Sequence, residues 1–217
     1  MGSRVFVYVD GFNFYNGAVK IKPQYKWLDL VALSKRLMVG YDVLKVKYFT
    51  AQVNGFESRL RQNIYWDALR SYHPDMLKIV EGYFVREKKK RPIARYQFDN
   101  GKKSVSGDRV WVVNTSEKCT DVNLAVHLIH DAWKDVYDTA LIVSNDSDLR
   151  EALILAKNEC GKEVVIANPF LWDPKGASSE LAKLNLPKRR IRETQLRACQ
   201  LPDTIPGTSI SKPPEWN

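Results

Sequence analysis

Apolar runs alternate with amphipathic stretches along most of this chain. The first run, residues 4–10, is apolar at nearly every position, which is typical of a central parallel strand covered on both faces. Runs of similar character predict strands at 43–51, 77–85, 110–113, 140–143 and 163–167. Helical spacing predicts helices at 28–38, 56–71, 121–134 and 148–159, and shorter elements are expected at 13–20, 178–184 and 189–192.

Strands that alternate with helices indicate an α/β fold with a mostly parallel central sheet, connected by right-handed crossovers. Residues 121–134 form the clearest helix. We expect its apolar stripe to pack on the sheet, and the stripe consists of Val122, Ala125, Val126, Ile129, Ala132 and Trp133.

Two segments depart from this alternation. Residues 86–110 begin with a strongly basic run and contain Pro92, which argues against a regular central strand, so we predict a protruding basic loop or hairpin. Residues 199–217 are rich in Pro, Thr, Ser and Gly and predict a flexible tail. The expected organisation is one domain, residues 1–198, followed by this tail.

Length and composition favour a single α/β domain and argue against a membrane protein or a disulfide-rich secreted protein. The chain has 217 residues, enough for one large α/β domain, and no apolar stretch approaches the ~20 residues of a membrane helix. Its N-terminus lacks the apolar core of a signal peptide. Cys119, Cys160 and Cys199 are odd in number and far apart, so neither a zinc site nor a disulfide framework is indicated. A reducing cytoplasm is the expected location.

The chain is strongly basic, with a formal net charge of +9 and a pI near 9.4. A basic surface attracts polyanions such as nucleic acids. The alternative interpretation is a soluble surface that is simply rich in lysine.

Four aspartates stand where buried strands should end or the next helix begins: Asp10, Asp121, Asp146 and Asp148. Parallel sheets place their working sites beyond the carboxyl ends of the strands. Gathered there, the carboxylates would repel each other unless a divalent cation lay between them, and Mg²⁺ and Mn²⁺ prefer such oxygen ligands. The turn after the first strand lacks G-x-G-x-x-G, and no Walker A loop is present, so dinucleotides fit poorly.

Each acid also has a structural interpretation. Asp148 with Glu151 matches a helix N-cap signature, and Asp121 can be a first-turn acid favoured by the helix dipole. Asp10 and Asp146 can be turn residues. The three histidines, His73, His127 and His130, are expected at the surface, and none is predicted to be catalytic.

Three motifs together resemble the NYN domain family, which belongs to the PIN-like nucleases. They are Asp10-Gly11-Phe12-Asn13, Glu117-Lys118-Cys119-Thr120-Asp121-Val122 and Val143-Ser144-Asn145-Asp146-Ser147-Asp148-Leu149. The match covers most of residues 4–168. Where the family often has Gly, this chain has Asn145, which tolerates left-handed backbone angles. The resemblance implies a three-layer α/β/α fold of PIN-like, Rossmann-like topology.

The resemblance also implies a metal-dependent endoribonuclease that hydrolyses RNA. Asp10, Asp121, Asp146 and Asp148 would bind Mg²⁺ or Mn²⁺, directly or through water. Asn13 would orient water or a phosphate, Ser144 and Ser147 would donate hydrogen bonds to the carboxylates, and Lys118 would meet a phosphate.

We expect the basic segment to clamp phosphates of RNA, or of DNA as an alternative, beside the acidic pocket. Its candidate phosphate contacts are Arg86, Lys88, Lys89, Lys90, Arg91 and Arg95, although a solvated loop would have the same composition. A further basic cluster is formed by Lys188, Arg189, Arg190 and Arg192. Bases could stack on Tyr15, Tyr25, Trp27, Tyr83 or Tyr96.

Two other functions stay open at this point. The chain can be a catalytically weak RNA-binding module of the same fold, or a metal-assisted enzyme that acts on a small anionic or heteroaromatic substrate, because a scaffold does not fix its reaction. A homodimer is also open, and no membrane partner is expected.

Overall fold

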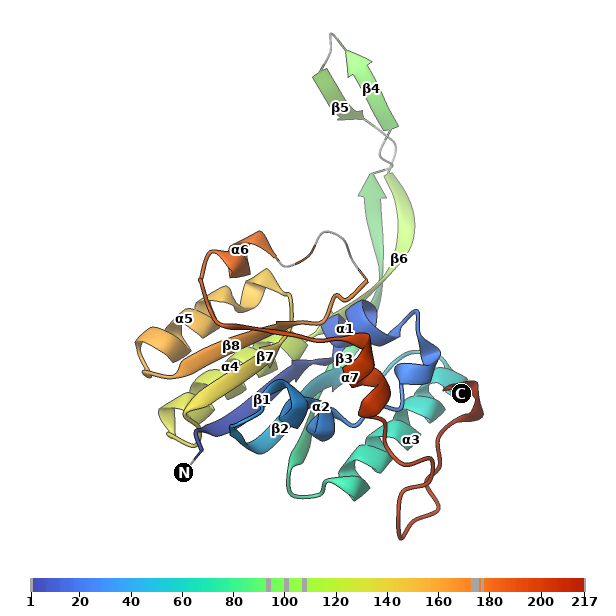
Figure 1. The fold of residues 1–217 in the computed structure, drawn as a ribbon. Coiled ribbons are helices and arrows are strands. Elements are labelled where there is room, and N and C mark those ends of the chain that lie inside the picture. The colour runs from blue at the N-terminus through green and yellow to red at the C-terminus, as the bar shows by residue number, and fades with distance from the viewer. Residues whose placement is uncertain are drawn as a thin grey trace.

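A seven-stranded sheet lies at the centre of the molecule, in the order β6-β3-β2-β1-β7-β8-β9 (Figure 1). The computed structural model describes residues 2–92, 109–172, 176 and 178–216, and the backbone of 95–99 and 102–106. Six of the strands are mutually parallel: β1 (Arg4–Asp10), β2 (Asp42–Ala51), β3 (Leu77–Pro92), β7 (Thr139–Val143), β8 (Glu163–Asn168) and β9 (Lys188–Arg190). Only β6 (Arg109–Lys118) is antiparallel to its neighbour, which confirms the predicted mostly parallel sheet.

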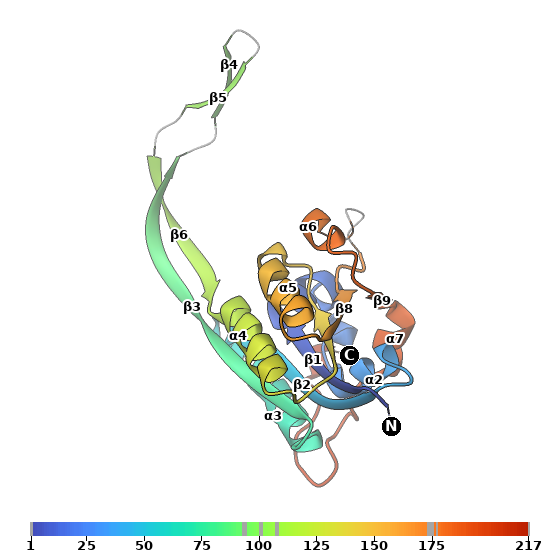
Figure 2. The same cartoon turned by 90° about the vertical axis from the view of Figure 1, so that its left-hand side faces the viewer.

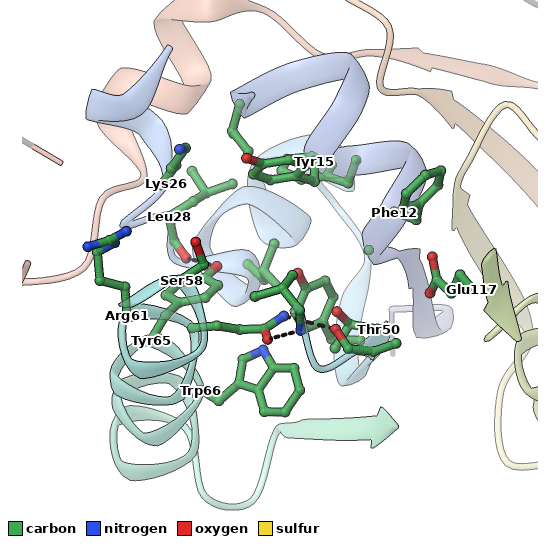
Figure 3. Close-up of a pocket in the computed structure, with 18 of the residues that line it drawn as sticks. Phe12, Tyr15, Lys26, Leu28, Thr50, Ser58, Arg61, Tyr65, Trp66 and Glu117 are labelled. Carbon is green, nitrogen blue, oxygen red and sulfur yellow. Dashed lines mark hydrogen bonds between the residues drawn. The ribbon is translucent and has the colours of Figure 1, made fainter. Parts of the chain in front are cut away.

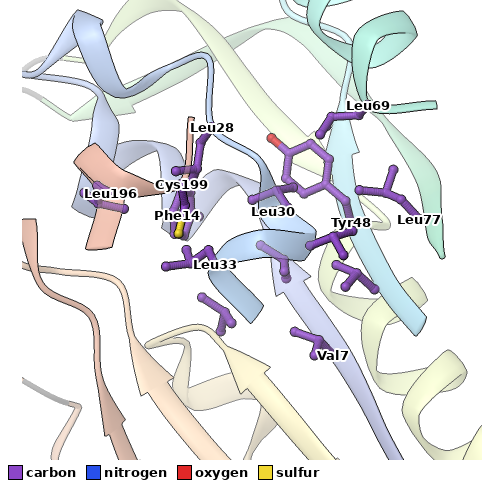
Figure 4. Packing of buried hydrophobic residues seen from close by; sticks show 14 of the residues in the cluster. Val7, Phe14, Leu28, Leu30, Leu33, Tyr48, Leu69, Leu77, Leu196 and Cys199 are labelled. Atoms are coloured by element: carbon purple, nitrogen blue, oxygen red, sulfur yellow. The ribbon is translucent and has the colours of Figure 1, made fainter. Parts of the chain in front are cut away.

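Helices cover both faces of this sheet, so the fold has the expected three layers (Figure 2). One hydrophobic cluster joins Val7 and Val9 of β1 to α2 (Leu30–Leu37), α3 (Phe56–Tyr72) and α7 (Glu193–Ala198) (Figure 4). The other joins Tyr8 of the same strand to α4 (Thr120–Trp133) and α5 (Arg150–Asn158). Alternate side chains of one strand therefore enter two separate cores. The short elements are α1 (Gly11–Phe14), a π-helical turn Tyr15–Val19, 3-10 turns Pro23–Tyr25, Ser147–Leu149 and Pro214–Trp216, and α6 (Ser179–Ala182).

Helix α4 packs on the sheet with a stripe that overlaps the predicted one in part. Ala132 is buried and Ala125 and Ile129 pack against the core, together with Leu124 and Leu128, which were not predicted. The prediction is wrong for Val122, Val126 and Trp133, which are exposed, Trp133 to 82%. Both stripes have helical spacing, so periodicity alone did not choose between them. The observed stripe also brings Asp131 into a buried ion pair that the sequence did not indicate. Lys47 Nζ lies 2.5 Å from Asp131 Oδ2, and Tyr8 OH donates to the same oxygen at 2.7 Å.

Strands β3 and β6 continue beyond the sheet as a two-stranded antiparallel ribbon (Figures 1 and 2). We call this ribbon, residues 83–92 and 109–118, the arm. A second hairpin, β4 (Arg95–Asp99) with β5 (Lys102–Ser106), follows at its end. The arm lies where a loop or hairpin was predicted, but β3 and β6 extend further than the strands predicted there. Pro92 does not interrupt β3, because it lies at the last position of the strand, where a missing N–H is tolerated.

The predicted flexibility of the C-terminal tail is wrong. Leu201, Ile205 and Trp216 are buried in the α2–α3 core, and Trp27 Nε1 donates to the carbonyl of Pro202 at 2.8 Å. The Trp216 ring lies 6.2 Å from that of Trp27. Proline-rich composition predicted disorder, but a few well-spaced apolar residues are sufficient to fix an extended segment to an open core face.

No helix among the described residues combines the length and apolar character needed to span a bilayer.

Candidate metal centre

The order of the strands reverses between β1 and β7. From β1 the chain proceeds to β2 and β3 on one side, and from β7 to β8 and β9 on the other. In open parallel sheets a crevice forms at such a switch point, outside the carboxyl ends of the strands. Asp10 is the last residue of β1, and Ser144 directly follows β7.

Asp10 is fully buried and held on both of its carboxylate oxygens. Asn13 N donates to Oδ1 at 2.9 Å, which makes Asp10 the N-cap of α1, and Ser144 Oγ donates to Oδ2 at 2.7 Å. Gly11 lets α1 begin immediately, because a Cβ at this position would lie 2.5 Å from the carbonyl oxygen of Phe49. The orientation of the Asp10 carboxylate is therefore set by the backbone of α1 and by the end of β7.

Asp146 and Asp121 reach the same point from other segments. Each of the three aspartates offers an oxygen, and these oxygens all lie within 4.8 Å of one another. Asp146 is fixed by two bonds: its N–H donates to Ser144 Oγ at 3.0 Å, and its Oδ1 accepts from Asp148 N at 3.0 Å. Ser144 thus contacts both Asp10 and Asp146.

Asp121 depends on a sharp turn between β6 and α4. Cys119 has a left-handed backbone, φ 70°, and the turn passes so close to β3 that a Cβ on Gly82 would lie 2.6 Å from the carbonyl oxygen of Lys118. The absence of a side chain at position 82 thus lets α4 start beside the sheet edge, with Asp121 in its first turn.

The electrostatics of the cluster favour a cation. Burial, followed by the charges of Asp146 and Glu117, raises the pKa of Asp10 to about 6. Asp121 is exposed at the rim of the cluster, and its pKa is also raised to about 6, by partial burial of its carboxylate and by the charges of Asp10, Asp146 and Asp148. A divalent ion would offset this repulsion, and the all-oxygen donor set fits Mg²⁺ or Mn²⁺.

The remaining predicted residues surround this triad. Asn13 Oδ1 accepts from Asn145 N at 3.3 Å and links the loops after β1 and β7. Asp148 is exposed and is not a member of the triad. Asp146 caps the 3-10 turn Ser147–Leu149, whereas α5 begins at Arg150 without a side-chain cap, so the N-cap role considered for Asp148 is wrong. Ser147 donates to none of the three carboxylates within the described part of the chain, and Lys118 is exposed at the end of β6.

Glu117 is a fourth acid that sequence analysis did not assign to the site. It is half-buried, Thr120 Oγ1 donates to it, and its charge contributes to the raised pKa of Asp10. Burial and the charge of Asp121 raise the pKa of Glu117 itself. In the sequence, the one indication that Glu117 lies near the site is its position four residues before Asp121.

A cavity of about 270 Å³ opens next to the cluster (Figure 3). Figure 3 shows Glu117 and Phe12 on one side of it and Lys26 and Arg61 on the other. The walls between them are largely aromatic and include Tyr15, Tyr48, Tyr65, Trp66, Phe84 and Trp216. The cavity therefore has an acidic end, an apolar middle and a basic end.

The other predicted binding residues are dispersed. Tyr25 and Trp27 are buried, whereas Tyr15 and Tyr83 are exposed. The side chains of Arg95 and Tyr96 lie outside the described part of the structure. The second basic cluster, Lys188 to Arg190 with Arg192, lines another cavity that reaches Asn145.

The histidines lie apart from the metal centre. His73 Nε2 is 2.8 Å from Asp29 Oδ1, and His127 Nδ1 is 3.2 Å from Lys47 Nζ. Both rings are half-buried, so the expected surface position is wrong for them, and only His130 is exposed.

We expect Ser144→Ala to weaken metal binding by roughly 10- to 100-fold, because it removes the donor to Asp10 and the acceptor for Asp146 N. Titration of the protein with Mn²⁺ by calorimetry measures this. Ser147→Ala is the matched control and should change the affinity less than twofold. Equal effects of the two substitutions would contradict the positioning role of Ser144.

Comparisons with known proteins agree with this architecture. The sequence profile of the NYN domain matches residues 4–184. A curated relative, 6-hydroxy-3-succinoylpyridine 3-monooxygenase HspA of Pseudomonas putida, is 31% identical over 98% of this chain and 75% of its own length. A crystal structure of a protein of unknown function from Vibrio parahaemolyticus superimposes with a TM-score of 0.52 at 16% identity, covering 88% of this chain and 94% of that one. This last similarity concerns the fold alone.

Proposed function

Because the chain belongs to the NYN domain family, we propose that it is a metal-dependent endoribonuclease that hydrolyses RNA phosphodiester bonds. One observation carries the proposal: oxygens of Asp10, Asp121 and Asp146, from three separate segments, meet within 4.8 Å at the switch point of the sheet. The net charge of +9 is consistent with a polyanionic substrate.

In this proposal Asp10, Asp121 and Asp146 hold Mg²⁺ or Mn²⁺, with Asp148 as a further ligand through water. The bound metal would supply a water of lowered pKa and stabilise charge on the leaving oxygen. Ser144 and the N–H of Asn13 keep the Asp10 carboxylate oriented. Lys118, at the end of β6, would contact a substrate phosphate.

Incubation of the purified protein with end-labelled single-stranded RNA tests the proposal. We expect internal cleavage products in Mn²⁺ and none in EDTA. RNA that stays intact in Mn²⁺ would contradict endoribonuclease activity. Salt-dependent binding of that intact RNA, unchanged by EDTA, would instead identify an RNA-binding module.

A second candidate function is favoured by the aromatic cavity. The name of the Pseudomonas putida relative describes action on a small pyridine with an acidic side chain. A heteroaromatic acid could place its ring between Tyr15 and Trp66 and its carboxylate toward Lys26 or Arg61. This candidate is therefore an enzyme that uses the same metal centre on a small heteroaromatic anion.

Tryptophan fluorescence separates the two candidates, because Trp66 and Trp216 line the cavity. The small-substrate function predicts saturable quenching by hydroxypyridine carboxylates that weakens in Lys26→Met. The nuclease function predicts cleavage of RNA and no such quenching.

A further inference from the structure

The arm has two faces with different chemistry. Side chains alternate along a strand, and directly opposite residues of an antiparallel pair lie on the same face. One face therefore carries the pairs Phe84–Glu117, Arg86–Thr115, Lys88–Val113, Lys90–Trp111 and Pro92–Arg109. We call it the cleft face, because Phe84 and Glu117 also line the aromatic cavity. The opposite, far face carries Tyr83–Lys118, Val85–Ser116, Glu87–Asn114, Lys89–Val112 and Arg91–Val110.

The outer part of the cleft face is basic and free of acids. Arg86, Lys88 and Lys90 are all exposed there, and beyond Glu117 no acidic residue shares this face in the described arm. The far face differs, because Lys89 Nζ lies 2.5 Å from Glu87 Oε1 and both side chains are only partly exposed. Neighbouring lysines of the same run thus differ in their availability to a ligand.

The same cleft face presents a large aromatic surface. Trp111 is 66% exposed, with Lys90 Nζ 5.3 Å from its ring centroid, and Val113 beside it is also exposed. An exposed Trp within a row of cations is the combination that binds single-stranded nucleic acid, in which bases are free to stack. Duplex backbones need the cations but not the aromatic ring.

The spacing of the cations also suits an extended strand. Arg86, Lys88 and Lys90 follow at every second residue, so they are about 7 Å apart along the strand. That interval is comparable to the separation of neighbouring phosphates in an extended single strand. The row ends at Phe84 and Glu117, which border the same cavity as Gly11, the residue after Asp10.

We propose that the cleft face of the arm binds single-stranded RNA and leads it to the carboxylate cluster, with Trp111 stacking on a base and Arg86, Lys88 and Lys90 contacting phosphates. This inference rests on the proposed nuclease function, and it assigns the far-face cations Lys89 and Arg91 no part in binding. It also selects Trp111, rather than the tyrosines considered from the sequence, as the stacking residue.

Fluorescence anisotropy with a labelled 20-nucleotide single-stranded RNA, in EDTA to prevent cleavage, tests the assignment. The double variant Lys88→Ser with Lys90→Ser should raise Kd at least about tenfold and reduce the slope of log K against log salt by about 1.4. Lys89→Ser with Arg91→Ser is the matched control: it removes the same charge from the far face and should change Kd less than threefold. Equal losses from the two double variants would overturn the proposal in favour of unspecific attraction.

Trp111→Ala should raise Kd by roughly 5- to 10-fold without changing the salt slope, and Trp111→Phe should restore most of the affinity. Unchanged binding in Trp111→Ala would overturn the stacking role. Duplex RNA that competes as well as single-stranded RNA would overturn the single-strand assignment. An unchanged thermal midpoint verifies that each variant is folded.

Cleavage assays separate this inference from the proposed function. In Mn²⁺, the Lys88/Lys90 double variant should cut the 20-nucleotide RNA more slowly at subsaturating concentration, but should cut a dinucleotide, too short to extend from the carboxylate cluster to Lys88, at the wild-type rate. Cleavage of both substrates at wild-type rates would overturn the arm assignment and leave the nuclease function standing. Arm-dependent binding without any cleavage would keep the arm assignment and overturn the nuclease function.

Discussion

Asp146→Asn is expected to abolish metal-dependent RNA cleavage, with a loss on the order of 10³-fold, in a protein that still folds. The substitution removes one of three negative charges that meet within 4.8 Å. Asn caps helices as well as Asp does, so its side chain can still accept from Asp148 N and keep the turn after β7. Initial cleavage rates in saturating Mn²⁺, with a thermal unfolding curve for each protein, measure both parts of the prediction.

Two further substitutions sharpen this test. Glu151→Gln removes the same charge from an exposed position in the first turn of α5 and should leave the rate within about twofold. Asp148→Asn distinguishes a direct ligand, with a loss comparable to that of Asp146→Asn, from a ligand through water, with a smaller loss. Cleavage by Asp146→Asn within tenfold of the wild type would remove this carboxylate from the metal centre.

The metal-free protein is expected to lose stability as the pH rises from about 4 to about 6, because burial holds the pKa of Asp10 at about 6. In the unfolded chain this carboxyl ionises near its ordinary pKa of 3.8. Between these values the folded state binds more protons than the unfolded state, so stability falls with rising pH and the loss is complete above about pH 6. A shift of about two pKa units corresponds to on the order of 2–3 kcal/mol.

Urea unfolding in EDTA at several pH values, compared between wild type and Asp10→Asn, isolates this contribution. The variant should be the more stable protein at pH 7, and the difference should vanish toward pH 4. Saturating Mn²⁺ at pH 7 should raise the thermal midpoint of the wild type by roughly 5–10 °C and leave that of Asp10→Asn unchanged. A wild-type midpoint insensitive to Mn²⁺ would argue against a metal at this cluster.

The aspartate cluster could be predicted from the sequence because it depends on backbone topology. Parallel strands end at a common edge, so Asp10 and Asp146, each just after a buried apolar run, had to come close together. Asp121 was identified through its motif. Glu117 was not assigned, because its place beside the triad depends on the turn at Cys119 and on the close approach at Gly82.

Three other features of the fold could not be predicted from the sequence, and each has a physical reason. Helix α4 offered two overlapping stripes of equal period, and the observed one buries Leu124 and Leu128 and pairs Asp131 with Lys47. The tail has the composition of a disordered segment, yet Trp216 has a core site between Trp27 and Tyr65. The difference between Lys88 and Lys89 follows from the pairing register with β6, which no property of the basic run itself reveals.

The chain enters the arm on β3 and returns on the adjacent strand β6, so the arm can be removed without breaking the path of the remaining chain. Glu87 and Asn114 face each other across the ribbon, three rungs out from Phe84 and Glu117. Joining the chain at this rung with a two-residue turn would keep the path of both strands into the sheet. The arm can therefore be lengthened, shortened or replaced at this rung without a change in the aspartate cluster.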